Sequence, residues 1–153
     1  MIINENLAYI KNFELTAIND RNRYRRIELP IYLVAGRKYT ISARVKQDPN
    51  GSGVITLRTY DETMTNIKDE KHCKIDDDGR VFLTFIYDEV STFYFLFYTD
   101  RAKETTGIGA SFDYVKLEKG EQMTPFLPHK ENLPKDNQPL LPPEGNYKEI
   151  TPL

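Results

Sequence analysis

Apolar and polar residues alternate with a period of two along much of the first 120 residues, which is the spacing expected of half-buried strands. Tyr39, Ile41, Ala43 and Val45 are apolar, whereas the residues between them are polar or charged. Between positions 92 and 98 apolar side chains occupy both parities, which predicts a central strand covered on both faces. The pattern predicts seven or eight strands, seven of which span residues 12–17, 24–33, 39–46, 54–60, 81–87, 92–98 and 112–117.

Residues that permit tight reversals stand between these strands. Clusters of Gly, Pro, Asp or Asn occupy residues 35–37, 48–51, 76–79 and 106–107, and each predicts a hairpin. No segment repeats apolar residues at the spacing of a packed helix, and residues 62–71 are predicted to form only a polar turn. The predicted fold class is therefore all-β, an antiparallel two-sheet β-sandwich of jelly-roll type.

Proline divides the chain into two parts near Gly120. Seven of the nine prolines lie after that residue, in the last 33 positions. A proline-rich segment is extended and does not continue a helix or the centre of a sheet. We predict a β-sandwich domain over residues 1–120, closed by residues 121–128, and a Pro-rich extended tail over residues 129–153.

Charge and cysteine content narrow the class of protein. The formal net charge of −2 is not that of a general nucleic-acid binder. Cys73 is the only cysteine, which leaves no intrachain disulfide and no cysteine zinc site and predicts folding in a reducing compartment. The chain opens without the basic and apolar regions of a signal peptide, and its longest apolar run, residues 93–98, is too short to span a membrane. We predict no export signal, no membrane insertion and no nucleic-acid partner.

The sequence holds no recognisable catalytic constellation. Its four serines lie outside any nucleophile-elbow motif, and His72 and His129 are far apart. His72 and Cys73 are adjacent and would point to opposite faces of a strand, so they would not share a metal. The three aspartates at 76–78 offer hard oxygen ligands for Ca²⁺, but with the glycine that follows they also make a complete hairpin turn, which we favour. We predict no enzymatic activity, no metal and no cofactor.

Four arginines surround one tyrosine near the start of the second predicted strand. Guanidinium groups bind phosphate or carboxylate in a bidentate manner, so this cluster is a candidate site for an anionic or glycan partner. The alternative is a solvated loop whose charges are matched by acidic neighbours. Tyr60, Tyr87, Tyr94 and Tyr98 are amphipathic enough to lie at a rim and to stack against sugars. The candidate cluster consists of Arg21, Arg23, Tyr24, Arg25 and Arg26.

A short signature ends the predicted domain. Residues 115–120 read VKLEKG and residues 124–128 read TPFLP. This stretch resembles the closing signature of carbohydrate-binding-like jelly-roll modules in bacteriophage tail, baseplate and fibre proteins, where a V-K-L-E-x-G strand precedes a T-x-aromatic-x-P segment. The resemblance implies that Phe126, which stands where those modules usually carry tryptophan, closes the end of the sandwich. No ligand-binding residue is carried over with it.

The proline-rich tail has apolar residues of its own. A sandwich already complete at Leu117 offers them no place, so we predict that they are buried against another subunit. The alternative is a flexible linker. The docking candidates are Leu133, Leu140, Leu141 and Tyr147.

Taken together, these features predict a non-enzymatic structural component of a phage virion. The sandwich would be a surface or adaptor module of the tail, baseplate or fibre, and its partners would be other virion subunits or further copies of itself. Such a protein is made and assembled in the host cytoplasm. The alternative is a receptor-binding module for a host cell-surface polysaccharide, with tyrosines and the arginine cluster as its site.

Overall fold

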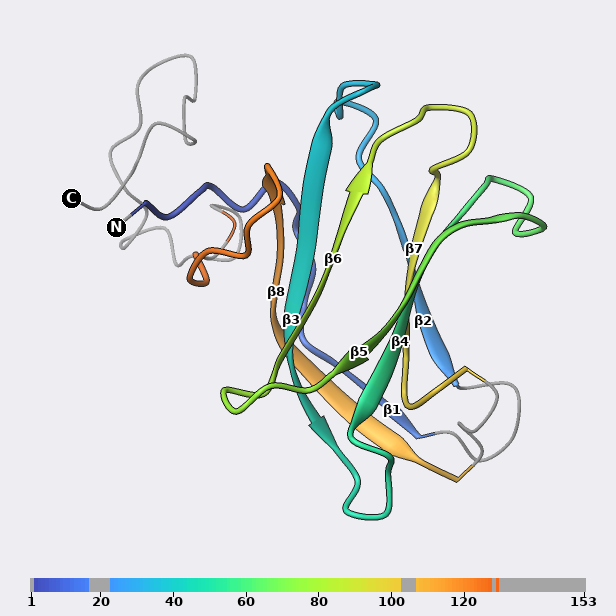
Figure 1. The fold of residues 1–153 in the computed structure, drawn as a ribbon, viewed down its shortest axis with the longest axis vertical. Helices are drawn as coiled ribbons and strands as arrows, with labels where there is room; N and C mark the ends of the chain where they lie inside the picture. Colours follow the sequence, from blue (N-terminus) through green and yellow to red (C-terminus); the bar gives the residue numbers. More distant parts are fainter. Residues whose placement is uncertain (1, 17–22, 103–106, 128, 130–153) are drawn as a thin grey trace.

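Eight strands account for the regular structure of residues 2–16, 23–102, 107–127 and 129, the part of the chain that the computed structural model describes. They form two antiparallel four-stranded sheets (Figure 1), which confirms the predicted all-β sandwich. These residues contain no helix, and hence none long and apolar enough to cross a membrane. The strands are β1 (Phe13–Thr16), β2 (Tyr24–Glu28), β3 (Lys38–Gln47), β4 (Val54–Tyr60), β5 (Ile67–Lys74), β6 (Arg80–Ile86), β7 (Tyr94–Tyr98) and β8 (Gly109–Lys119).

The core lies between the two sheets, whose strand orders are β1-β8-β3-β6 and β2-β7-β4-β5. It is built from the apolar positions of the period-two pattern. Ile41, Phe85, Phe97 and Phe112 are each at most 2% exposed. The ring centroids of Phe97 and Phe112 are 5.3 Å apart, so these side chains join one sheet to the other. Removing this apolar surface from water is the main favourable term in folding.

The turns connect opposite sheets rather than neighbouring strands. Of the consecutive strands only β4 and β5 are hydrogen-bonded to each other, and every other connection passes from one sheet to the other. The hairpins predicted at residues 35–37, 48–51, 76–79 and 106–107 are therefore wrong as pairings of neighbours. Turn residues determine that the chain reverses, whereas burial of both inner faces determines which strand it joins.

The acidic turn at residues 76–79 reverses the chain between strands of different sheets. Asp76 Oδ1 accepts hydrogen bonds from the amides of Asp78 at 2.9 Å and Arg80 at 2.7 Å. Gly79 has a φ of 78°, a left-handed conformation that favours glycine. The turn is locally complete, as the sequence predicts, but it leads from β5 in one sheet to β6 in the other.

Strand β5 occupies part of a segment that was predicted to form only a polar turn. Of its side chains only Cys73 is buried. Lys71 also helps to close the open side of the sandwich, because its Nζ donates to the Phe82 carbonyl at 2.9 Å and lies 3.5 Å from the centre of that ring. An edge strand of this kind tolerates charged residues, which hide its period-two pattern.

Strand β8 pairs with both β1 and β3 and contains a bulge. Ser42 of β3 faces Lys116, but Arg44 faces Asp113, so an extra residue of β8 is accommodated between these pairs. Tyr114 lies in the bulge with a φ of 50°, which is uncommon for a residue other than glycine. The bulge divides the outer face of β8 into two parts with different surroundings.

Candidate functional site

Tyrosines gather on the outer face of the sheet formed by β2, β7, β4 and β5. Tyr24 pairs with Tyr98 across β2 and β7, and Tyr94 pairs with Tyr60 across β7 and β4. Alternate residues of each strand share this face, so arginines, glutamates and a histidine lie among the rings. We call this surface the tyrosine face; it consists of Tyr24, Arg26, Glu28, Arg58, Tyr60, Glu70, His72, Tyr94, Leu96 and Tyr98.

Arg58 organises the centre of the tyrosine face. Its Nη1 donates to the phenol oxygen of Tyr60 at 3.1 Å and to that of Tyr98 at 3.0 Å. Its Nε donates to Glu70 Oε2 at 2.5 Å, and Glu70 Oε1 lies 3.4 Å from His72 Nε2. Charge-assisted bonds of this kind are short and directional, so they hold the rings and the carboxylate in fixed positions.

The tyrosine face rests on a small apolar cluster of its own. Leu96 is fully buried and Tyr98 is 2% exposed, and the half-buried rings of Tyr24, Tyr60 and Tyr94 pack against them. The ring centroids of Tyr24 and Tyr98 are 5.3 Å apart and the ring planes are inclined at 45°, so these two rings do not form a flat platform. Burial raises the pKa of the Tyr98 phenol to about 12 against the opposing effect of the nearby guanidinium, and the phenol stays protonated near neutral pH.

Strand β2 separates two members of the predicted arginine cluster. Arg25 and Arg26 are consecutive, so they point to opposite faces. The Arg25 guanidinium lies 4.8 Å from the centre of the Phe13 ring at the edge of the core, whereas that of Arg26 lies 4.5 Å from the Tyr94 ring on the tyrosine face. Of these two arginines, only Arg26 joins the predicted tyrosines.

The remaining predicted residues are divided as well. Tyr24 belongs to the tyrosine face, and Arg23 Nη1 donates to the Ala102 carbonyl at 3.4 Å. Tyr87 is buried in the main core rather than at a rim. Arg21 lies outside the described residues. The anionic or glycan partner assigned to the cluster stays a prediction.

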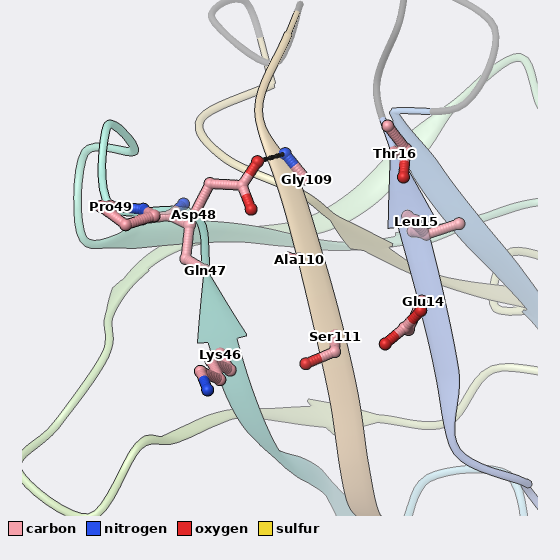
Figure 2. A pocket seen from close by; sticks show the side chains of 10 residues that line it. All are labelled: Glu14, Leu15, Thr16, Lys46, Gln47, Asp48, Pro49, Gly109, Ala110 and Ser111. Atoms are coloured by element: carbon pink, nitrogen blue, oxygen red, sulfur yellow. Dashed lines mark hydrogen bonds between the residues drawn. The ribbon is translucent and has the colours of Figure 1, made fainter.

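A second candidate surface lies on the other sheet, at the start of β8 (Figure 2). This β8 pocket has a volume of about 400 Å³, within the range of small-molecule sites. The cross-strand register places Glu14 of β1 and Lys46 of β3 on either side of Ser111. The ten residues that line it are Glu14, Leu15, Thr16, Lys46, Gln47, Asp48, Pro49, Gly109, Ala110 and Ser111.

Small residues of β8 keep the pocket open. Gly109 donates its amide to Asp48 Oδ2 at 2.7 Å, as Figure 2 shows. A Cβ at this position would lie 3.0 Å from that oxygen and 3.1 Å from the Leu15 carbonyl, so any other residue would require these neighbours to shift by a few tenths of an ångström. The described residues that line the pocket offer carboxylate, ammonium and hydroxyl groups and include no aromatic ring.

Side chains that commonly bind metal ions do not form a cluster within the described ranges. There, no group of three or more His, Cys, Asp or Glu side chains is placed to hold a metal ion. Cys73 is a free cysteine and is buried. The ring of Phe126, predicted to close the domain, is half-buried and stacks on that of Tyr114 at 4.7 Å and 21°. The predicted docking residues Leu133, Leu140, Leu141 and Tyr147 lie outside the described residues.

Arg58 and Glu70 were not predicted from the sequence. Arg58 is one polar position of an alternating strand, and Glu70 belongs to β5, which was not predicted. Their pairing depends on β4 and β5 forming the one local hairpin of the fold. The only available signal was the opposite charge of two residues twelve positions apart, which is too common to identify a contact.

Comparison with known proteins yields similar folds and no family. No protein-family model matches the chain, and no curated protein sequence matches it. Among solved structures it is similar to a family 16 carbohydrate-binding module (13% identity, TM-score 0.46, covering 71% of this chain and 76% of that one). It is also similar to the CBM22-1 and GH10 modules of Clostridium thermocellum xylanase 10B complexed with xylohexaose (15% identity, TM-score 0.47, covering 80% of this chain and 29% of that one). A third similar structure is the module CBM6cm-2 of Cellvibrio mixtus lichenase 5A in complex with cellotriose (10% identity, TM-score 0.35, covering 79% of this chain and 98% of that one).

These likenesses concern the architecture alone. The chain spans less than a third of the xylanase structure that it matches. Each of these three structures is, or contains, a carbohydrate-binding module, and none of the three is a bacteriophage protein. At identities of 15% or less we infer neither ligand nor activity from them.

Proposed function

We propose that the protein is a non-catalytic carbohydrate-binding module and that the tyrosine face is its sugar-contacting surface. The observation that carries the proposal is the assembly of three half-buried tyrosines, two arginines, two glutamates and a histidine on one sheet face. Tyrosine presents an apolar ring with a polar edge, which suits a pyranose that has both apolar C–H faces and hydroxyl groups. Guanidinium and carboxylate groups supply the donors and acceptors for those hydroxyls.

The hydrogen-bond network supports this function through rigidity. Arg58 fixes Tyr60 and Tyr98, and Arg26 lies over Tyr94, so much of the surface is already ordered before a ligand arrives. A preorganised surface loses less side-chain entropy on binding, which favours affinity. The proposed ligand is a polysaccharide segment lying across β2, β7 and β4.

Affinity electrophoresis tests the proposal. The full chain is run through native gels that contain purified bacterial envelope polysaccharides, neutral in one set and acidic in another. Retardation by at least one polymer is expected, with loss of the effect in Tyr94→Ala and Arg26→Ala. Tyr114→Ala is the matched control, because that tyrosine is 41% exposed on the opposite sheet.

The outcomes separate the two candidate surfaces. Ser111→Trp places a large side chain in the β8 pocket and leaves the tyrosine face intact. If Ser111→Trp abolishes retardation while Tyr94→Ala does not, the sugar site is the pocket and the tyrosine face is excluded. Absence of retardation by every polymer contradicts the carbohydrate-binding proposal itself.

A second candidate function is docking in a larger assembly. Exposed apolar residues in the loops after β2 and β6 favour it: Ile31 is 89% exposed, Val90 80% and Tyr32 61%. The two loops are adjacent, because Gly36 donates its amide to the Tyr87 carbonyl at 2.8 Å. Surfaces of this kind mark protein contacts. The signature at residues 115–128 implies that such an assembly is a phage virion, and this setting remains a prediction.

Light scattering tests whether the two loops drive self-association. The native chain is compared with a double variant that carries Ile31→Ser and Val90→Ser, and a smaller particle mass is expected for the variant.

A further inference from the structure

Two charged side chains are completely covered on the outer face of β8. Lys116 and Glu118 alternate in the strand and therefore share that face. Both side chains are 0% exposed, and Lys116 Nζ lies 3.8 Å from Glu118 Oε1. Charged groups are rarely buried on the outer face of a sandwich, so another part of the chain must cover and satisfy them.

The covering part is the segment after β8, residues 121–127, which we call the strap. Lys116 Nζ donates to Thr124 Oγ1 at 2.8 Å and to the Pro125 carbonyl at 2.7 Å. The Thr124 amide donates to Glu118 at 3.2 Å from each carboxylate oxygen. The lysine and the glutamate thus bind the strap through its backbone as well as through its threonine.

The hydroxyl of Thr124 uses its full hydrogen-bonding capacity. It donates to Glu118 Oε1 at 2.5 Å, accepts from Lys116 Nζ, and accepts from the backbone amide of Asn4 at 3.2 Å. Asn4 Nδ2 also donates to Glu118 Oε1 at 3.1 Å. A hydroxyl has one hydrogen and two lone pairs, so one threonine joins the strap, β8 and the N-terminal segment.

Further contacts hold the strap at each end. At its start Lys38 Nζ lies 2.9 Å from Glu121 Oε2, and near its end the Phe126 ring stacks on Tyr114 at the bulge. The Arg44 guanidinium lies 4.0 Å from the centre of the same tyrosine ring. The strap therefore covers the part of β8 beyond the bulge and leaves the β8 pocket open on the other side.

We propose that Lys116, Glu118 and Thr124 form a clamp that fastens the strap and the N-terminal segment as one unit and so fixes the direction in which the chain leaves the domain. The proposal does not depend on carbohydrate binding. It gives a physical meaning to the signature in residues 115–128: the lysine and glutamate of VKLEKG are spaced by two to share a face, and the threonine of TPFLP binds both. In this arrangement the strap and the N-terminal segment open together.

Hydrogen exchange of the full chain, read by mass spectrometry, tests the clamp. Thr124→Val keeps the size and branching of the side chain but removes the hydroxyl, whereas Thr124→Ser keeps the hydroxyl. In Thr124→Val, exchange in residues 120–127 and in residues 2–8 is expected to accelerate about tenfold or more, since hydrogen bonds to charged groups are lost. Thr124→Ser is expected to stay close to the native rates. Strands β3 and β4 report in each sample that the sandwich remains folded.

Each outcome bears on the proposal. Native exchange rates in Thr124→Val would show that the hydroxyl does not fasten the strap. Equal acceleration in Thr124→Ser would assign the effect to the lost methyl group and also overturn the clamp. Acceleration confined to residues 120–127 would contradict the coupling of the two segments. If Thr124→Val fails to fold, Asn4→Ala removes the side-chain hydrogen bonds of Asn4 to Glu118 and to the Lys119 carbonyl but keeps the bond from its backbone amide to Thr124. Faster exchange in residues 120–127 is then the expected result, and native rates there would contradict the coupling of the two segments.

Discussion

The side chain of Asn6 supplies hydrogen bonds that β8 would otherwise receive from a neighbouring strand. The Leu117 amide donates to Asn6 Oδ1 at 3.1 Å, and Asn6 Nδ2 donates to the Val115 carbonyl at 3.0 Å. Strand β1 pairs with β8 only from Gly109 to Phe112, so these backbone groups lie beyond its reach. Asn6 is 1% exposed, which excludes water as a substitute.

Asn6→Ala is therefore expected to destabilise the domain by about 2 kcal/mol, because the buried amides of Leu117 and Ala8 and the buried carbonyl of Val115 lose their partners. Urea denaturation followed by circular dichroism measures the loss. Asn12→Ala, at an exposed position, is the control and should change the free energy of unfolding by less than about 0.5 kcal/mol. A loss no larger than that of the control would mean that the segment of Asn6 does not contribute to the stability of the sheet.

Phe126→Ala is expected to cost about 1–2 kcal/mol rather than the 3–5 kcal/mol of a core phenylalanine. The ring is half-buried and its recorded aromatic contact is the stack on Tyr114. Thermal melts of Phe126→Ala, Tyr114→Ala and the double variant measure whether the two losses are coupled. Strictly additive losses would contradict the stack as a stabilising contact.

The buried lysine predicts an unusual pH dependence. Burial lowers the pKa of the Lys116 ammonium from 10.5 to about 8, against the attraction of Glu118 on β8 and with the repulsion of Arg80 on β6. Between pH 8 and 10.5 the native protein has lost this proton while the unfolded chain retains it, so the unfolded chain binds more protons. This group therefore makes the free energy of unfolding rise with pH in that interval, by at most about 1.4 kcal/mol per pH unit.

Other groups titrate in the same interval, so the measurement is the difference between the native chain and Lys116→Met. Urea denaturation at several pH values should show this difference growing in favour of the native chain as the pH is raised. A difference that stays constant, or that shrinks, would contradict the lowered pKa.

Gly109→Ala is expected to destabilise the domain by about 1 kcal/mol and to narrow the β8 pocket. The added Cβ meets the Leu15 carbonyl at 3.1 Å, and a strand backbone yields less readily than a flexible side chain. Ser111→Ala is the control, since it removes only a hydroxyl from the same strand. Thermal melts compare the two, and a Gly109→Ala protein as stable as the control would mean that β1 shifts freely.

The sequence predicted the strands better than it predicted their partners. Alternation identified β3 through its apolar inner positions 39, 41, 43 and 45. It identified β4 through Ile55 and Leu57, although the third inner position of that strand is Thr59. It failed for β5, an edge strand on which only Cys73 is buried. Strand order depends on burying the inner faces of the two sheets against each other, and no local sequence pattern shows this. Turn residues alone therefore predict hairpins at connections that in fact pass from one sheet to the other.

The candidate site was predictable in part for the same reason. Tyr94, Tyr98 and Arg26 were recognised by residue type, and the fold brings them to one face through the pairing of β2 with β7. Arg58 was not recognised, since its role comes from the neighbours that it reaches across strands. The sequence gives Thr124 only as one letter of the TPFLP motif. Its contacts with Lys116 and Glu118 arise because the segment after β8 returns over that strand.

Strand β8 is the last of the eight along the chain, yet it lies inside its sheet between β1 and β3. Phe13 has its partner Phe112 almost a hundred residues later. During synthesis β1 must therefore wait unpaired until residues 109–119 have left the ribosome, and contacts of such long range form slowly. We expect the sheet β1-β8-β3-β6, and with it the cover over one side of the core, to be completed only after β8 has emerged.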